Sequence, residues 1–198
     1  MNPSTLRDLR RSQIIKVARQ IVAERGLEAL TIGGLEGSLD FSRGVITYHF
    51  KNKEEIVFAV FNSAIEEIDA ATMAMVKKST SSQDKIAALV RANVHGFLAK
   101  AEAGRILLSF WGRLQADGRA KDRNATLYAR YRSTTAALIE SGQRSGDFRG
   151  DIDADACATV IVGMVIGIAT QTIFEDDAVD VDAAVNEAAG MLADRLRP

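Results

Sequence analysis

The chain has 198 residues, 47% of them hydrophobic, a length and composition that exclude intrinsic disorder and allow one large or two small domains. The two prolines, Pro3 and Pro198, stand at the termini, so we expect helix almost throughout and an all-α fold. The net charge of −1 hides a gradient, because residues 5–53 carry a net +4 and residues 146–198 a net −8. The net charge therefore does not exclude a nucleic-acid partner for the N-terminal segment.

Three helices are predicted in the first fifty residues. Residues 5–25 place apolar side chains at helical spacing. Two short segments follow, at 32–39 and 42–48, and each is headed by a hydroxyl residue able to cap it, Thr31 and Ser42. Two short helices joined by a tight turn indicate a helix-turn-helix.

A long helix is predicted next, from about residue 52 to 79, because Asn52 and Glu55 have the spacing of a capping box. Polar and glycine-containing breaks divide the remaining chain into five helices. They are expected at about residues 83–100, 103–116, 120–144, 152–174 and 180–196. We thus expect about nine helices, with an N-terminal helix-turn-helix domain over residues 1–52 and a C-terminal helical domain over residues 53–198.

The segment from Thr31 to Ile56 reads TIGGLEGSLDFSRGVITYHFKNKEEI, and it resembles the DNA-binding domain of the TetR family of bacterial regulators. In that family a Thr-headed helix, a turn, a short recognition helix and a Tyr-x-His/Tyr-Phe-x-x-Lys-Glu signature occur at this spacing. The upstream IIKVARQIVAERG is similar to the family's first helix. The positions that match the signature are Ser42, Arg43, Gly44, Tyr48, Phe50, Lys53 and Glu54.

The residue types of the second short helix suit contact with DNA. Gly44 removes a side chain that would hold the backbone away from the major groove. Arg43 can bind a guanine edge, and Thr47 can offer a methyl to thymine or a hydroxyl to phosphate. Tyr48 and His49, at the end of the helix, are expected to reach backbone phosphates.

Two further residues are expected near phosphate at the start of other helices. Lys53 adds a cation beside free N–H groups, and Thr31 can act similarly one helix earlier. By contrast, Val45, Ile46 and Phe50 are interpreted as core. The predicted DNA-binding residues are therefore Thr31, Ser42, Arg43, Gly44, Thr47, Tyr48, His49 and Lys53.

Four residues depart from the family pattern, namely Gly33, Gly34, Glu36 and Asp40. Each glycine in a helix interior costs about 1 kcal/mol relative to alanine. We therefore predict that the helix over residues 32–39 is short or frayed and that its domain is marginally stable. An alternative hypothesis follows, in which the DNA-binding half has decayed and the chain is a dimeric helical module that binds a ligand or a protein.

An uncharged stretch of nineteen residues, 156–174, reaches membrane-spanning length. Its acidic flanks and its polar residues favour a helix covered by protein, and the N-terminus lacks an apolar leader, so we expect a cytoplasmic protein and no membrane partner. The resemblance implies that this helix and the next pair with their copies in a homodimer, although ordinary packing within one chain is the alternative. The expected interface residues are Gly163, Ile166, Gly167 and Thr170.

Polar and aromatic residues punctuate the apolar faces of the middle helices. In the family this region binds a small-molecule effector, and apolar walls with a few polar groups suit a ligand, although core packing is the alternative for each residue. The sequence does not name the ligand. The candidate ligand-binding residues are His95, Phe97, Phe110, Trp111, Gln115, Tyr128, Tyr131 and Gln171.

Enzyme signatures are missing from the sequence. His49 and His95 lie far apart with no CxxC or HExxH around them, and there is no P-loop or G-x-S-x-G. Cys157, the single cysteine, lies in an apolar run and is expected to be a buried, inert thiol. We expect no catalytic residue, metal or cofactor. The predicted function is a transcriptional regulator, a repressor released from double-stranded operator DNA by a small molecule; an activator or a ligand-independent repressor would leave the same sequence features.

Overall fold

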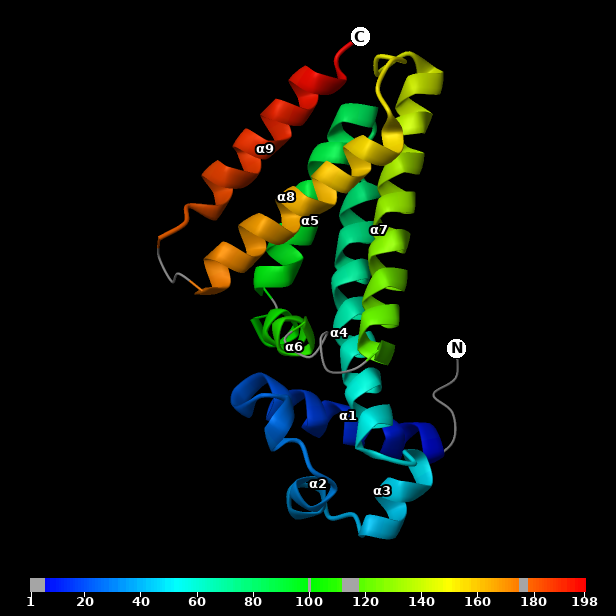
Figure 1. Cartoon of the computed structure of the whole chain (residues 1–198), viewed down its shortest axis with the longest axis vertical. Coiled ribbons are helices and arrows are strands. Elements are labelled where there is room, and N and C mark those ends of the chain that lie inside the picture. Colours follow the sequence, from blue (N-terminus) through cyan, green and yellow to red (C-terminus); the bar gives the residue numbers. More distant parts are fainter. Residues whose placement is uncertain (1–5, 100, 112–117, 175–177) are drawn as a thin grey trace. The chain divides into compact units, whose positions relative to one another are not determined.

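The computed structural model describes residues 6–99, 101–111, 118–174 and 178–198. These residues form nine α-helices and one short 3₁₀ turn, with no β-strand among them (Figure 1), which confirms the predicted all-α class. The helices are α1 (Leu6–Arg25), α2 (Ile32–Ser38), α3 (Arg43–His49), α4 (Lys53–Val76), α5 (Ser82–Ala99), α6 (Ala101–Trp111), α7 (Gly118–Ser145), α8 (Ala154–Phe174) and α9 (Val181–Leu196).

Local signals account for most of the helix ends. Gly26 follows α1 with φ 80°, a conformation that favours glycine. At the start of α4, Asn52 Oδ1 accepts a hydrogen bond from the Glu55 N–H at 2.9 Å, and Glu55 Oε2 accepts one from the Lys51 N–H at 2.9 Å. The predicted capping box is therefore present, with the glutamate reaching one residue further back than the usual arrangement.

The end of α7 is fixed by a tight packing contact. Phe148 lies over Gly142, where an added Cβ would come within 2.1 Å of Phe148 Cδ2. The Asp147 carboxylate accepts hydrogen bonds from Ser82 Oγ at 2.7 Å and from Ser145 Oγ at 2.9 Å. These bonds hold the pKa of Asp147 below its usual value. The loop after α7 is thus joined to the start of α5.

The chain divides into two compact units inside α4. The first contains residues 1–67 and 101–116, and the second contains residues 68–100 and 117–198. This division does not coincide with the predicted boundary after residue 52. Most of α4 and all of α6 group with the N-terminal helices instead, because they pack against them.

In the first unit, the short helices α2 and α3 pack on a buried apolar core. Its fully buried side chains include Ile14, Leu35, Ile46, Phe50 and Phe61. Arg19 of α1 donates to Glu67 Oε2 of α4 at 2.7 Å and to Ser63 Oγ at 3.0 Å. Arg105 of α6 donates to the Ala23 carbonyl at 3.1 Å, which joins α6 to the end of α1.

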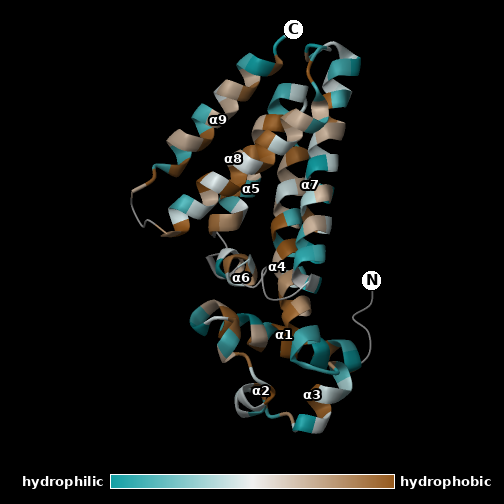
Figure 2. Cartoon of the chain, viewed as in Figure 1, coloured by the Kyte–Doolittle hydropathy of each residue, from teal (hydrophilic) through white to brown (hydrophobic). Residues whose placement is uncertain are grey.

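The second unit packs α5, α7, α8 and α9 around one apolar cluster that includes Val90, Ile139, Ile161 and Val185. α8 has hydrophobic residues along its length (Figure 2), yet only three of its 21 residues are buried, Ala158, Ile161 and Ala169. Among the described residues it is the one helix long and apolar enough to cross a membrane by length and composition, a test that core helices also pass. Covering of α8 by protein is thus incomplete within one copy of the chain.

Candidate nucleic-acid interface

α3 has one face in the core and one face in solvent. Ile46 is fully buried and Phe50, just after the helix, is 1% exposed, which anchors the helix to the first unit. Arg43, Gly44, Thr47 and Tyr48 are exposed, and Tyr48 keeps 70% of its surface in solvent although it is aromatic. An exposed aromatic side chain and an exposed arginine on one short helix indicate a surface available for binding a partner.

The polar side chains of α3 and of Ser42 before it differ in whether they are hydrogen-bonded within the chain. Thr47 Oγ1 donates to the carbonyl oxygens of Arg43 at 2.9 Å and Gly44 at 3.3 Å, so its hydroxyl hydrogen is used within the helix and its methyl is available to an outside partner. Ser42 was expected to cap α3, but its hydroxyl makes no cap hydrogen bond. The Arg43 guanidinium has no hydrogen-bond or ion-pair partner among the residues that the structure describes. A Cβ added to Gly44 would meet only Ser42 Oγ, at 3.9 Å, so packing within the chain does not require glycine here.

His49 lies differently from our expectation that it reaches a phosphate. Its side chain is only 9% exposed, and Nδ1 is buried without a hydrogen-bond partner among the described residues. The residue shares the inward face of α3 with Ile46, three positions earlier, and this spacing explains its burial. Burial and the nearby cations of Arg7, Arg10 and Arg11 lower the pKa of His49. The imidazole is therefore neutral at pH 7 and part of the packing against α1.

The neighbouring helices supply the two remaining predicted residues. Thr31 caps α2 as expected, since its Oγ1 accepts from the Gly34 N–H at 2.9 Å. Gly34 suits this cap, because a Cβ there would lie 3.1 Å from Thr31 Oγ1, whereas at Gly33 it would meet nothing within 4 Å. Lys53 is the first residue of α4 and is half-buried. α2 is short, with seven residues, and its stability stays a prediction.

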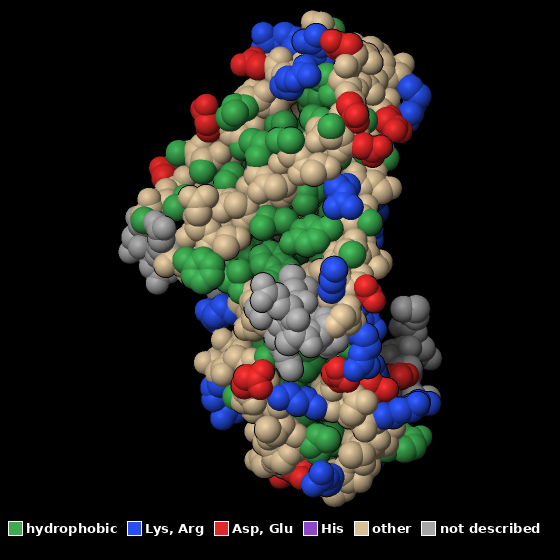
Figure 3. Space-filling view, in the orientation of Figure 1, with side chains coloured by type: hydrophobic (Ala, Val, Ile, Leu, Met, Phe, Trp, Pro, Cys, Tyr) green, Lys and Arg blue, Asp and Glu red, His purple; other side chains and the backbone are tan. Residues whose placement is uncertain are grey.

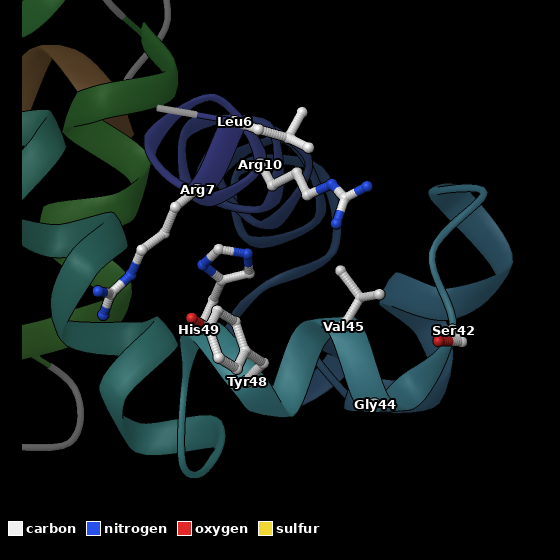
Figure 4. Close-up of a pocket in the computed structure, with 8 residues that line it drawn as sticks. All are labelled: Leu6, Arg7, Arg10, Ser42, Gly44, Val45, Tyr48 and His49. Carbon is white, nitrogen blue, oxygen red and sulfur yellow. The ribbon is translucent and has the colours of Figure 1, made fainter. Parts of the chain in front are cut away.

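The start of α1 was not among the predicted site residues. Leu6, Arg7 and Arg10 of α1 line a hollow together with residues of α3 (Figure 4). Arg11 donates to the His49 carbonyl at 3.1 Å, and its guanidinium carbon lies 4.2 Å from the centre of the Phe50 ring. The signal was present, because arginines at positions 7, 10 and 11 share one helix face and contribute to the positive N-terminal segment.

Comparison with known proteins identifies the family. Residues 14–60 match the sequence model for bacterial regulatory proteins of the tetR family. Residues 82–197, more than half of the chain, match the model for the C-terminal domain of BetI-type transcriptional repressors. The chain belongs to the TetR family. It is therefore a DNA-binding transcriptional regulator, as the sequence predicted.

Individual TetR-family relatives are similar over most of the chain. The transcriptional repressor KstR2 of Rhodococcus jostii is 25% identical, covering 74% of this chain and 71% of the relative. The regulator TtgR of Pseudomonas putida is 24% identical, covering 94% and 91%. A solved transcriptional regulator from Saccharomonospora viridis in complex with choline superposes with a TM-score of 0.81 at 23% identity, covering 95% of this chain and 97% of its own. That structure shows the shared fold.

The predicted effector-binding residues of this TetR-family chain are divided between the two units, and their role in ligand binding stays a prediction. Phe110 belongs to the first unit, where its ring stacks on Phe61 with 4.0 Å between centroids. His95 Nε2 lies 3.2 Å from Asp182 Oδ1 and links α5 to α9. Gln171 is exposed and donates to the Gly167 carbonyl of its own helix. These three have structural contacts that sequence periodicity could not distinguish from ligand contacts.

The other effector candidates are more enclosed. Phe97 is buried, Tyr128 is half-buried, and burial raises the pKa of both Tyr128 and Tyr131. Trp111 is half-buried in the first unit, and Gln115 lies outside the described residues. The sequence analysis did not single out Thr72, whose hydroxyl is buried with no hydrogen-bond partner in the described part of the chain. A lone buried hydroxyl has no sequence signature.

The predicted dimer residues lie on the open side of α8. Gly163 is exposed, whereas Ile166, Gly167 and Thr170 are half-buried. A Cβ at Gly163 or Gly167 would meet nothing within 4 Å, so neither glycine is explained by packing within the chain. On the face drawn in Figure 3, hydrophobic side chains gather over the second unit. In this unit Val160, Phe174 and Met191 are each more than half exposed.

Proposed function

We propose that this TetR-family protein is a homodimeric repressor that inserts two copies of α3 into the major groove of an operator and leaves it when a small molecule binds the second unit. One observation carries the DNA-binding part of the proposal. α3 is anchored by Ile46 and Phe50 while it exposes Arg43, Gly44, Thr47 and Tyr48 together. A helix so anchored can present its polar face in a fixed register.

The exposed residues suit different parts of DNA. Arg43 is a free cation that can bind the O6 and N7 acceptors of a guanine. Thr47 offers its methyl for contact with the thymine methyl, since its hydroxyl is engaged. Tyr48, Ser42 and Lys53 can contact phosphates and fix the position of the helix without reading sequence. Thr31 can join them only by sharing the oxygen that caps α2.

Two-fold pairing through α8 and α9 is the assembly that supports this function. α8 exposes apolar residues and two glycines that face open space in one copy. Small residues four apart allow two helices to approach closely, and apolar surface removed from water contributes about 25 cal/mol per Å². A dimer would also supply two recognition helices for two half-sites. The acidic segment over residues 146–198 would keep phosphate away from that part of the surface.

The effector is proposed to bind among the helices of the second unit, near Phe97 and Tyr128, with the Thr72 hydroxyl as a polar partner. Support comes from the BetI-type match over this region and from the S. viridis relative, which was solved with choline. The ligand would bind one of two dimer states more tightly than the other. The ratio of the two affinities would set how far the equilibrium moves toward the state that leaves DNA. A repressor of this kind acts in the cytoplasm, where the DNA lies, and carries out no chemical step.

The experiment is selection of bound duplexes from a randomised DNA library by the purified protein at two salt concentrations, followed by sequencing. An enriched inverted repeat is the expected result, and it would provide the operator on which effectors are screened for release. Arg43→Ala serves as the matched variant, because it leaves the anchor of α3 intact. A folded dimer that enriches no sequence would contradict the proposal and favour the decayed, partner-binding module.

A further inference from the structure

A hollow with a volume of about 420 Å³ lies between α1 and α3 in the first unit. Its wall on the α1 side is formed by Leu6, Arg7 and Arg10 (Figure 4). Its other wall is formed by Ser42, the residue before α3, and by four residues of α3, namely Gly44, Val45, Tyr48 and His49. The hollow thus opens beside the exposed face that the proposed function assigns to the major groove.

The two arginines of the hollow are not neutralised by close partners. The guanidinium carbon of Arg7 lies 5.8 Å from the centre of the Tyr48 ring, and that of Arg10 lies 6.0 Å from the centre of the Phe41 ring. Neither side chain has an ion-pair or hydrogen-bond partner in the described ranges. Arg11, one position on, donates to the His49 carbonyl instead. Asp8 is the carboxylate of this turn and makes a contact of its own.

The pKa of His49 responds to these cations. Its side chain is more than nine-tenths buried in the wall of the hollow, and its Nδ1 has no partner among the described residues. After burial, the cations Arg7, Arg10 and Arg11 are the next causes that lower the pKa of this histidine, and Asp8 opposes them. Two guanidinium groups thus line the hollow at neutral pH, and none of the residues that line it carries a carboxylate.

We propose that Arg7 and Arg10 bind the phosphodiester backbone of DNA next to the segment that α3 reads, so that α1 forms a second wall of the DNA-binding surface. The inference rests on the proposed function. Guanidinium groups match phosphate oxygens in geometry and charge. Leu6 and Val45 suit the apolar edge of a deoxyribose between two phosphates. A phosphate contact adds affinity for any sequence and fixes the register of α3.

The test compares Arg7→Gln, Arg10→Gln and the double variant with the wild-type protein. Binding to the selected operator and to a scrambled duplex of equal length is measured by fluorescence anisotropy at several KCl concentrations. The slope of log K against log salt should become shallower by about 0.9 for each phosphate that the variant no longer neutralises, counted in both protomers of a dimer. Affinity should fall by the same factor for both duplexes, with the enriched base sequence unchanged.

Arg25→Gln is the matched control, because it removes the same charge from the exposed last turn of the same helix. It should keep the wild-type slope, and the charge-retaining variants Arg7→Lys and Arg10→Lys should keep most of it. Circular dichroism confirms that each variant is folded. If Arg7→Gln and Arg10→Gln behave like Arg25→Gln, or if they change base preference, the inference is wrong. Wild-type protein that enriches no operator would instead contradict the proposed function, and the slopes on scrambled DNA would still decide the role of the arginines.

Discussion

α3 and α8 expose opposite kinds of surface. α3 has seven residues, hides Ile46 and presents a cation, a methyl and a phenol ring. α8 has 21 residues, hides three of them and leaves Val160 and Phe174 at 59% and 72% exposed. Polar exposed surface is compatible with water, whereas apolar exposed surface is stabilised when something covers it. The contrast indicates two different partners, a polyanion for the first helix and an apolar partner, such as a second copy, for the other.

Among the variants that test this contrast, Gly163→Arg should have the largest effect on operator affinity. A charge and a long side chain on the open face of α8 should separate the protomers, because an unpaired charge would be buried between them. Without the second recognition helix, operator binding should weaken by at least about 100-fold, or about 3 kcal/mol. Sedimentation velocity measures the assembly and fluorescence anisotropy the affinity.

Gly118→Arg is the control for this variant. Gly118 begins α7, is exposed and, like Gly163, has nothing within 4 Å of an added Cβ. It should leave the dimer and the affinity unchanged. A Gly163→Arg protein that remains a dimer would show that another surface joins the copies.

The polar side of the comparison is sharpened by two changes in α3. Arg43→Ala should cost about 1–3 kcal/mol per contact and relax the base preference at one symmetric pair of positions. Tyr48→Ala should weaken operator and scrambled DNA alike, since a phosphate contact carries no sequence information. Parallel library selections with each variant separate these outcomes. Altered base preference in Tyr48→Ala would assign the tyrosine to bases instead.

A smaller effect is expected from the glycines of α2, which support α3. Gly33→Ala should raise the free energy of unfolding by up to about 1 kcal/mol, because alanine favours helix and its Cβ meets nothing. Gly34→Ala should gain less or lose stability, since its Cβ would crowd the Thr31 oxygen that caps α2. Urea unfolding compares the two. Equal gains would mean that the cap is not sensitive to this contact.

The smallest effect at neutral pH concerns His49. Burial first, and then the nearby arginines, hold its folded-state pKa below the ordinary 6.5. Below pH 6.5 the unfolded chain therefore binds a proton that the folded chain does not, so the free energy of unfolding should fall as pH decreases from 7 toward the folded-state pKa. This part of the pH dependence should be missing from His49→Gln. Identical pH profiles for both proteins would contradict it.

Local sequence signals predicted the helices, whereas the grouping of the helices depends on tertiary packing that the sequence does not show. The spacing of apolar residues and the caps at Thr31 and Asn52 act within a few residues, so most helices begin and end within two residues of the predicted bounds. The predicted end of the helix over residues 103–116 lies outside the described residues. The packing of α6 on α1, which includes the Arg105 contact with Ala23 82 positions away, has no such local signal. His49 is different, because its spacing of three positions from the core residue Ile46 already places it on the inward face of α3.

The arginines of α1 and the effector candidates illustrate the same limit. Arg7 and Arg10 share one face of a positive helix, but the sequence does not say which surface that face adjoins, because this depends on the helix that packs beside them. His95, Phe110 and Gln171 fit the pattern of ligand-binding residues, but each is engaged by a neighbour. A polar residue on an apolar face predicts that it has a partner and does not say which.

The Thr47 hydroxyl donates its hydrogen to carbonyl oxygens of its own helix, which leaves its methyl available for contact with a base. A methyl distinguishes bases by the group at pyrimidine C5, where thymine carries a methyl and uracil and unmodified cytosine carry hydrogen. At the base pair facing Thr47, uracil in place of thymine should therefore weaken binding, and 5-methylcytosine should imitate thymine at this contact. The side chain would thus distinguish bases at this position by the group at pyrimidine C5.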